Sequence, residues 1–263
     1  MKEKVLMENM NWVEIKDAIE NGKKTVLLIS GSIEQHGPHL PTGTDTILGY
    51  EIAKRAARQL GNTLVAPVIR PCLSEHHMGF PGSFTLSSET YHRVLKDHCE
   101  SLANCGFKDI LLLSSHGGNT AVLTAIVPDI AIKLYGRANV HLIDYLSLSA
   151  EAALPFLEEK GISRAKAGVH AGYSETSLML VASPRLVKME CAEKGLDEES
   201  FYDPVNLSRS QIDTFILGVK HYSGNGVLGD PRKASLEVGE KLMEIVVTAV
   251  VKAASNALGA TPP

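Results

Sequence analysis

A short apolar segment, followed by a loop crowded with acids and histidines, constrains this chain more than any other feature. Residues 25–30 read Thr-Val-Leu-Leu-Ile-Ser, an apolar run with β-branched side chains that is typical of a buried strand. The loop that follows contains glycines and prolines together with Glu34, His36, His39 and Asp45. Burying ionisable groups is costly unless they are paired or bind a cation, so this loop favours a metal site at the end of a strand.

Strand-like and helix-like patterns alternate along most of the chain, at lengths that suit parallel strands joined by helices. This alternation predicts an α/β fold, a three-layer α/β/α sandwich with a mostly parallel central sheet. No linker, internal repeat or low-complexity segment interrupts the pattern, so we expect residues 1–263 to form a single domain. The first expected helix would be capped by Asn11 and would carry Trp12 on its apolar face. The expected strands cover residues 25–30, 64–69, 110–113 and 140–145, and the expected helices cover 11–21, 46–60, 88–102, 120–135 and 235–257.

Composition and charge narrow the function classes. The 263 residues are 44% hydrophobic and 21% charged, which is ordinary for a globular protein with a sizeable core. The net charge of −4 argues against nucleic-acid binding, which needs a basic surface. No window is apolar enough for a membrane-spanning helix, the first residues lack the apolar stretch of a signal peptide, and the four cysteines show no paired spacing. We therefore expect a cytoplasmic protein with reduced, packed thiols and no membrane or nucleic-acid partner.

The ligand spacing in the first loop suits divalent metal ions. Glu34 and His36 are two residues apart, so in extended backbone their side chains point to the same side. Asp45 can return to them because the intervening loop contains glycine and proline. Carboxylates with imidazoles suit Zn²⁺, Mn²⁺ or Fe²⁺, and a shared carboxylate would place two ions about 3.5–4 Å apart. The alternative is a surface loop whose acids and histidines are merely hydrated.

Three further residues follow strands or begin helices, where parallel sheets gather their sites. His116 ends an apolar strand and precedes two glycines, and it is either a ligand or a structural histidine. His170 could act as a general acid or base, support a ligand, or be an ordinary loop residue. Glu175 would fall in the first turn of a helix, where the helix dipole stabilises a carboxylate even without a ligand.

The loop at residues 71–84 is long, rich in glycine and proline, and carries Ser74, Glu75, His76 and His77. Loops of this kind inside a compact domain are usually functional, and this one is either a substrate-contacting segment or a structural lid. The sequence signatures of nucleophilic catalysis and of phosphate-binding loops are absent from the chain. The candidate chemistry is therefore metal-dependent.

These residues together resemble the motifs of the creatininase (creatinine amidohydrolase) family. The similarity runs in order through almost the whole chain, and its first motif is specific. The matching segments are residues 31–41 with Asp45, 80–83, 115–119, 170–177 and 226–231.

The resemblance implies a three-layer α/β/α fold, two divalent metal ions and hydrolysis of an amide-type C–N bond in a small molecule. By position, Asp45 would bridge the two ions, Glu34 and His116 would complete one site, and His36 would bind the other ion. His170 would handle the proton, and a metal-activated hydroxide would attack the carbonyl carbon. Zn²⁺ is the first expectation for the ions, with Mn²⁺ or Fe²⁺ as alternatives, and the family's members are commonly homohexamers.

Two positions depart from creatininase itself. Gly118 stands where creatininase has a glutamate, so Glu175 is the candidate for the missing ligand and for a catalytic role beside His170. The only tryptophan, Trp12, lies in the first expected helix, whereas creatininase encloses its substrate with tryptophans. Two tyrosines could partly replace them, and we expect a substrate other than creatinine. The residues expected to contact substrate are Ser74, Glu75, His76, Gly117, Gly118, Tyr145 and Tyr173.

The same family pattern leaves three hypotheses for the function. The first is creatininase-type hydrolysis of a non-peptide amide or cyclic amide. The second is a deformylase of a formamidopyrimidine nucleotide, or a peptidase that matures a peptide-derived cofactor, since the family also contains these activities. The third, from another class, is a metal-binding subunit without turnover, and the presence of His170 beside the ligand set argues against it.

Overall fold

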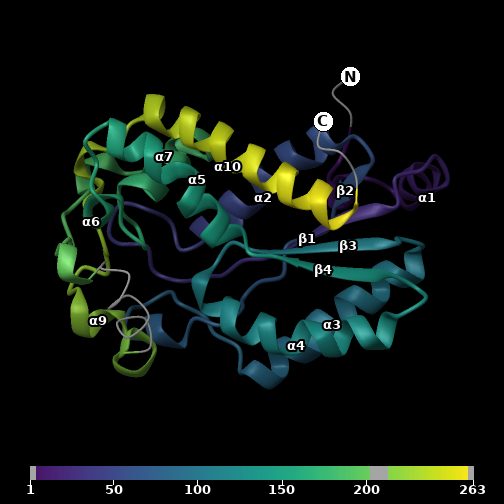
Figure 1. Ribbon diagram of the computed structural model, residues 1–263. Helices are drawn as coiled ribbons and strands as arrows, with labels where there is room; N and C mark the ends of the chain where they lie inside the picture. The colour runs from purple at the N-terminus through teal and green to yellow at the C-terminus, as the bar shows by residue number, and fades with distance from the viewer. Residues whose placement is uncertain (1–3, 202–212, 260–263) are drawn as a thin grey trace.

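Four parallel strands form the central sheet of the computed structural model, which describes residues 4–201 and 213–259 (Figure 1). Their order across the sheet is β2-β1-β3-β4. Each neighbouring pair is parallel, and Thr25 of the second strand in this order faces both Thr63 and Asp109. The strands span Thr25–Ser30 (β1), Thr63–Val65 (β2), Asp109–Ser114 (β3) and Asn139–Ile143 (β4).

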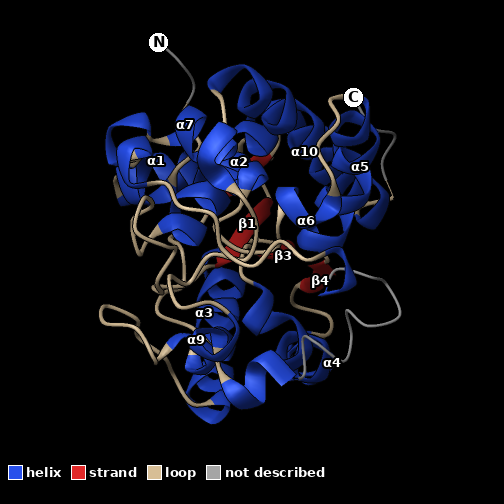
Figure 2. Ribbon diagram, turned by 90° about the vertical axis from the view of Figure 1, so that its left-hand side faces the viewer, coloured by secondary structure: helices blue, strands red, loops and turns tan. Residues whose placement is uncertain are grey.

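Helices cover both faces of the sheet, which confirms the predicted three-layer α/β/α architecture (Figures 1 and 2). The helices above the sheet in Figure 1 are α2 (Thr44–Leu60), α5 (Tyr145–Glu159), α7 (Tyr173–Ala182) and α10 (Leu236–Ala257). Those below it are α3 (Ser88–Cys105) and α4 (Thr120–Leu134). The shorter helices are α1 (Trp12–Glu20), α6 (Arg164–Ala167) and α9 (Val219–Tyr222), and residues 213–217 are also helical.

Alternation along the strands divides the core between the two faces of the sheet. Leu27 and Ile29 of β1 belong to the cluster that contains the buried side chains of α2 and α10. Val26 and Leu28 belong to the cluster that contains those of α3 and α4. All four side chains are at most 1% exposed. A strand buried on both faces appears in sequence as a continuous apolar run, which is why this segment could be recognised.

Side-chain caps fix the helix starts that the sequence predicted. The Asn11 side chain accepts hydrogen bonds from the backbone N–H groups of Val13 and Glu14, and the Glu14 carboxylate accepts one from the backbone N–H of Asn11. Ser87 and Ser235 accept hydrogen bonds in the same way at the starts of α3 and α10. These caps satisfy N–H groups that have no partner inside the helix.

Two predicted strands are shorter than expected. The strand expected at residues 64–69 ends at Val65, and Pro67, which has no N–H to donate, breaks the ladder beyond it. The strand expected at 140–145 ends at Ile143, because Asp144 caps α5 by accepting a hydrogen bond from the Ser147 N–H at 3.2 Å.

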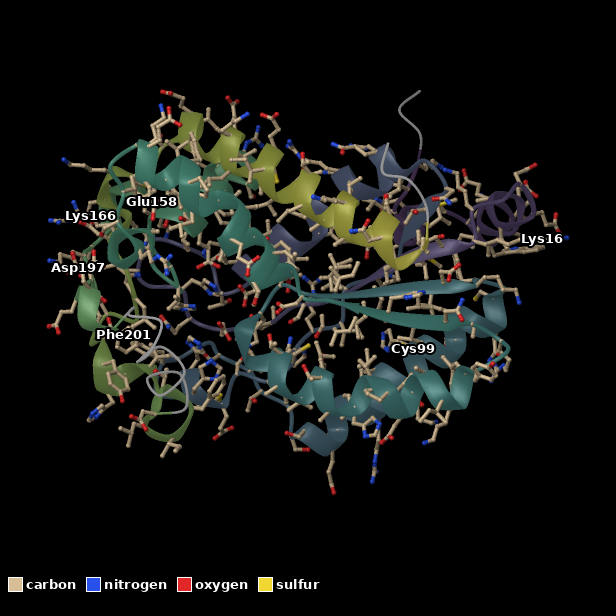
Figure 3. The ribbon with its side chains drawn as sticks, viewed as in Figure 1. Lys16, Cys99, Glu158, Lys166, Asp197 and Phe201 are labelled. Carbon is tan, nitrogen blue, oxygen red and sulfur yellow. The ribbon has the colours of Figure 1, made fainter. Side chains whose placement is uncertain are left out.

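Two expectations about single side chains also need correction. Trp12 is 75% exposed and does not belong to the apolar face of α1, whose Ala18 and Ile19 pack partly buried against the core below the sheet. All four cysteines are free thiols, but only two of them are packed in the core. Cys72 and Cys99 are buried, the latter on α3 below the sheet in Figure 3, whereas Cys105 is exposed and Cys191 is half-buried.

The parallel register places the carboxyl ends of β1, β3 and β4 at one edge of the sheet. The loops that leave this edge contain the predicted ligands Glu34, Asp45 and His116. Sites of parallel α/β proteins form outside such an edge because the strand ends leave polar loops facing a common space. Within the described residues, no helix is both long and apolar enough to cross a membrane.

Candidate metal centre

The loop after β1 folds back so that Asp45 returns to the end of the strand. Asp45 lies in the first turn of α2, where Ser32 Oγ donates a hydrogen bond to its Oδ2 at 2.5 Å. Ser115 Oγ, just after β3, donates to the backbone carbonyl of Asp45 at 2.8 Å. The carboxylate is 4% exposed, so its position is fixed from two neighbouring strands.

Asp45 stands between two histidines, one on each side of its carboxylate. Its Oδ1 lies 3.2 Å from His36 Nε2, and its Oδ2 lies 3.1 Å from His116 Nδ1. Glu34 Oε2 lies 3.2 Å from His116 Nε2, and Glu175 Oε1 lies 3.5 Å from His36 Nε2. Two groups of possible metal ligands therefore share Asp45: one with Glu34 and His116, the other with His36 and Glu175.

Backbone contacts fix the tautomers of both histidines. His36 Nδ1–H donates to the carbonyl of Glu34 at 3.1 Å, and His116 Nε2–H donates to the carbonyl of Leu73 at 2.7 Å. When either ring is neutral, the nitrogen that faces Asp45, Nε2 of His36 or Nδ1 of His116, therefore carries the lone pair. Metal-binding histidines are oriented by the same kind of contact on the opposite nitrogen. Three carboxylates and two such imidazoles form a donor set that fits Zn²⁺, Mn²⁺ or Fe²⁺.

The electrostatics of the cluster also favour the binding of cations. Burial alone would lower the pKa of His36, but the carboxylates of Glu175 and Asp45 hold it well above 6.5. Burial alone would also lower the pKa of His116, but the carboxylates of Glu34 and Asp45 raise it well above its usual value. Burial would raise the pKa of the Asp45 carboxyl, yet the two histidines hold it well below 3.8. The cluster thus binds positive charge, as protons or as metal ions.

Glu175 comes from the start of α7. The first-turn position predicted for it is correct, and its Oε2 accepts a hydrogen bond from the Ala171 N–H at 2.6 Å. Its other carboxylate oxygen, Oε1, faces His36. The dipole of α7 stabilises the charge of this carboxylate, and the hydrogen bond from Ala171 to Oε2 leaves Oε1 available to a ligand.

Gly118 leaves no room for the side chain that creatininase has at this position. A Cβ on Gly118 would lie 2.3 Å from His116 Nε2 and 2.3 Å from the Leu73 carbonyl oxygen. These are the two atoms of the hydrogen bond that orients His116. The carboxylate that lies beside His36 is that of Glu175, which reaches it from another segment.

Histidines from two other loops surround Glu34. His77 Nε2 lies 3.3 Å and His170 Nδ1 lies 3.7 Å from Glu34 Oε1. The ring centroids of His170 and His36 are 4.2 Å apart. Burial lowers the pKa of His170 and that of His77, so both imidazoles are neutral near pH 7. Glu34 also forms possible ligand groups with His76 and His77, and with His36 and His170.

A cavity of about 270 Å³ opens beside Glu34 and His170. Of the residues predicted to contact substrate, His76, Gly117 and Gly118 line it. Ser74 is buried and donates a hydrogen bond to Glu34 Oε2 at 2.7 Å, so it orients a ligand instead. Glu75 is exposed and does not line the cavity.

The two tyrosines predicted to enclose the substrate lie elsewhere. Tyr145 begins α5 and is buried beside Ile29 and Leu113, within the core above the sheet. Tyr173 begins α7 and faces a different surface hollow, which Lys166 and Asp230 also line. Neither side chain therefore lines the cavity, because both helices direct these positions away from it.

Several residues that sequence reasoning missed form the outer part of the cavity. The signal for Asp144 was its place directly after β4, at the same sheet edge as His116. Phe215 lies against His76, with ring centroids 4.3 Å apart, and its weakly patterned segment gave no signal. Phe201, near α9 at the left of Figure 3, also lines the cavity. The other missed lining residues are Thr120, Leu146, Ser147, Val169, Thr214, Val219 and Leu228.

The sequence matches one protein family and several characterised proteins. A family model described as creatininase, creatinine amidohydrolase, matches residues 8–254. A mycofactocin precursor peptide peptidase of Mycolicibacterium smegmatis is 29% identical over 227 residues, which cover 84% of this chain and 81% of that protein. A creatinine amidohydrolase of Pseudomonas putida is 25% identical over 263 residues, covering 96% and 97% of the two chains.

Solved structures share the fold along the whole chain. The crystal structure of a creatinine amidohydrolase (creatininase) superposes with a TM-score of 0.79 at 23% identity, covering 99% of this chain and 100% of that one. A manganese form of creatininase gives a TM-score of 0.79 at 24% identity with the same coverage. A Zn-Zn form of a creatininase variant gives 0.78 at 23% identity and covers all of both chains.

Proposed function

We propose a function from the premise that this chain belongs to the creatininase family, whose model matches nearly its whole length. The protein is an amidohydrolase of this family, and it acts on carbon–nitrogen bonds other than peptide bonds. The observation that supports a metal-dependent reaction best is the position of Asp45, with one carboxylate oxygen toward His36 and the other toward His116. A carboxylate placed in this way suits the bridging ligand of a two-metal site.

Two divalent ions would be held by five side chains. One ion would bind Glu34, Asp45 and His116, and the other would bind His36, Asp45 and Glu175. We propose Zn²⁺ first, because solved members of the family include Zn and Mn forms and the imidazole share of the donor set favours zinc. Mn²⁺ and Fe²⁺ are the alternatives.

When bound, such ions supply Lewis acidity, which acidifies water and polarises the substrate carbonyl. The chain's own residues supply the rest. Ser74 holds Glu34 in place by donating a hydrogen bond to its Oε2, and Ser32 holds Asp45 in place by donating one to its Oδ2. His170 is neutral, lies at the cavity wall beside Glu34, and would accept and return the proton of the reaction.

The cavity supports a small amide as substrate. His76 lines it, is 8% exposed, and has no hydrogen-bond partner for its ring among the described residues. A buried polar group of this kind is a candidate contact for a substrate group. A peptidase is the second candidate, since a relative at 29% identity carries that name and the outer cavity contains the apolar side chains of Leu146, Val169 and Phe215. A nucleotide deformylase and a metal-binding subunit without turnover are the remaining alternatives.

The assembly and the location are part of the proposal. We propose a homo-oligomer, with a hexamer as the first expectation from the family resemblance, which light scattering would test. We also propose a cytoplasmic location, in accord with four free thiols.

The test combines metal analysis with a substrate panel. The purified protein, its metal-stripped form and forms reloaded with Zn²⁺ or Mn²⁺ would be assayed on creatinine, on simple formamides and on short peptides. We expect two ions per chain and hydrolysis of a non-peptide amide that is lost on stripping and restored on reloading. Asp45→Asn should lose both ions and at least about a hundredfold in rate, because both ligand groups share this carboxylate.

The matched control is Asp97→Asn, a change of the same type at an exposed position of α3. It should keep metal content and rate at the wild-type level. Full activity of metal-free protein would refute metal dependence, and cleavage of peptides alone would favour the peptidase.

A further inference from the structure

Gln35 lies between two metal-ligand candidates, and its side chain makes more contacts than its place in the loop requires. It is 6% exposed. Its Nε2 lies 2.9 Å from His77 Nδ1, 2.9 Å from His170 Nε2 and 3.1 Å from the Gly226 carbonyl oxygen. Its Oε1 accepts a hydrogen bond from the Gly37 N–H at 2.9 Å.

The orientation of this amide is fixed by two backbone groups. The Gly37 N–H can only donate, so the atom that faces it must be the amide oxygen. The Gly226 carbonyl can only accept, so the atom that faces it must be the amide nitrogen. A flipped amide would break both contacts and would set donor against donor and acceptor against acceptor. Gln35 therefore presents two N–H groups to Gly226 and the histidines.

The two hydrogens of the amide face three possible acceptors, the Gly226 carbonyl, His77 Nδ1 and His170 Nε2, and His170 Nε2 is the one that has another partner. The carbonyl of Gln35 itself lies 2.8 Å from His170 Nε2, so His170 Nε2–H donates to it. The two amide hydrogens then go to the Gly226 carbonyl and to Nδ1 of His77. His77 must carry its own proton on Nε2, which faces Glu34 Oε1 at 3.3 Å. His170 is left with a lone pair on Nδ1, which faces the same carboxylate oxygen at 3.7 Å.

We propose that Gln35 is a positioning residue that sets the tautomer of His77 through its side-chain amide and that of His170 through its backbone carbonyl, making His77 a hydrogen-bond donor to Glu34 and His170 a proton acceptor. The proposal deepens the function given above, and it rests on His170 handling the proton there. Gln35 acts through the two histidines and does not itself contact the cavity. Its side-chain amide thus decides which nitrogen of His77 is basic, and its backbone carbonyl decides this for His170.

This role gives a function to the late loop at residues 226–231, which contributes no candidate metal ligand. Gly226 has φ +80, and a Cβ there would lie 1.9 Å from Gln35 Oε1. The residue is therefore glycine for a steric reason, because the amide occupies the space of a side chain. The backbone of Leu228 also forms an antiparallel bridge with His170, so the loop holds the partner as well as the amide.

The same arrangement of protons argues against a third metal-binding group around Glu34. Glu34, His76 and His77 could form a third metal group by distance alone. A metal ion at this position would need the lone pair of His77 Nε2 and a proton on Nδ1. The Gln35 amide donates to Nδ1 and so excludes that tautomer. We therefore assign His77 to orienting Glu34.

Neutron diffraction tests the proposal directly, on the wild-type protein loaded with Zn²⁺ and on its metal-free form. We expect deuterium on Nε2 of both His77 and His170, none on Nδ1 of either ring, and the Gln35 oxygen toward Gly37. A deuterium on Nδ1 of either neutral ring would overturn the proposal. No turnover is needed for this measurement, and metal analysis of the same crystals reports separately on the proposed function.

Gln35→Glu supplies the functional test, because it replaces the donating nitrogen by an oxygen of similar size. We expect His77 to take a proton on Nδ1 in the neutron structure of the variant. On the best amide of the panel above, kcat should fall at least about tenfold while KM stays within about threefold. Two metal ions should remain, since Glu34 and Leu73 carbonyls, and not Gln35, orient the ligands His36 and His116.

Gln59→Glu is the matched control, the same change at an exposed position near the end of α2. It should leave kcat, KM and metal content unchanged. If Gln35→Glu loses metal and kcat together, or leaves the tautomers as they are, Gln35 is a structural residue and the proposal is wrong. Should Gln35→Glu fail to fold, Gln35→Met, which removes both donors without adding charge, is measured in its place with the same expectations for kcat and metal.

Discussion

Gly118 decides which carboxylate can complete the second ligand group. Gly118→Ala would push a methyl group against the two atoms of the hydrogen bond that orients His116, each 2.3 Å away. Overpacking of this kind costs about 1–3 kcal/mol, so we expect a lower melting temperature. The rotated His116 should also lower the metal content measured after equilibration with Zn²⁺.

Gly117→Ala is the neighbouring control for that substitution. Its Cβ would meet no described atom closer than Leu146 Cδ1 at 3.9 Å, so the melting temperature should stay close to that of the wild type. Equal losses at the two positions would contradict the steric argument.

A conservative substitution of Glu175 tests whether this carboxylate binds metal. Glu175→Gln keeps the size of the side chain, and its amide can still accept the Ala171 N–H hydrogen bond. It removes the charge that faces His36, so we expect bound metal to fall from about two ions per chain to about one in an elemental analysis.

Glu237→Gln, at an exposed position in the first turn of α10, is the control and should keep both ions. Retention of both ions by Glu175→Gln would remove Glu175 from the ligand set.

Individual side chains were predictable from sequence where the chemistry is local. Glu34, His36 and Asp45 share one loop behind a recognisable strand, so their proximity follows from the loop alone. Tyr145 and Tyr173 were assigned to the cavity as aromatic residues near it in sequence, yet the helix phase of α5 and α7 turns them elsewhere. Phase at the first residue of a helix depends on tertiary packing, which a residue pattern does not record.

At the scale of secondary-structure elements, the contact between the α6–α7 connection and the loop at residues 226–231 fixes the position of His170. The α6–α7 connection carries His170, and the late loop runs beside it, with the Leu228 N–H donating to the His170 carbonyl at 2.9 Å. Gly229, with φ +146, lies so close that a Cβ would be 2.8 Å from Gly172 Cα and 2.9 Å from Gly168 Cα. Three glycines from two loops thus allow the backbones to touch.

Gly229→Ala should therefore loosen the loop pair. Backbone cannot yield as a flexible side chain does, so we expect a loss of about 1–3 kcal/mol in the free energy of unfolding, measured by denaturant titration. Because His170 shifts with the loop, the rate on the best amide should fall as well. Gly224→Ala, in the same loop but with open space around its Cβ, should change stability by no more than about 0.5 kcal/mol.

Helices and strands were predictable from the sequence where a capping residue or a regular apolar period marks them. Ser87 and Ser235 cap α3 and α10, which start close to the expected residues. The segment at residues 190–222 has only weak patterning in sequence. It contains α9 and Phe215, and its residues 202–212 lie outside the described part of the chain. Apolar residues that line a cavity serve a ligand and not a core, so they follow neither the strand nor the helix period.

In the whole molecule, the candidate centre joins segments that are far apart in the chain. Glu34 and His116 follow strands β1 and β3, whereas Asp45 and Glu175 lie in the first turns of α2 and α7. The core on both sides of the sheet holds these elements in register. Metal ions bound by all of them would act as cross-links present only in the folded protein. Each tenfold excess of free metal over its dissociation constant would then add about 1.4 kcal/mol to stability.

Stability of the metal-free protein should depend on pH in a way that bound metal removes. The carboxylates around His36 and His116 raise the pKa of both imidazoles well above 6.5, against the effect of burial. A raised pKa in the folded state contributes stability that is fully present below 6.5 and is lost as the pH rises through the folded value. Bound metal takes the place of these protons, so the loaded protein should not show this loss.

The gap in melting temperature between loaded and stripped protein should therefore widen as the pH rises above about 6.5. Asp45 and Glu175 do not offset it, because their lowered pKa values contribute stability that is lost only at acidic pH, as the pH falls through the folded values. Thermal unfolding in Zn²⁺ and in EDTA, between about pH 6 and pH 9, measures the gap directly. In the metal-free state, His36→Asn should flatten the decline, since one of the two proton-binding imidazoles is gone. A gap that stays constant over this range would show that His36 and His116 do not exchange protons for metal.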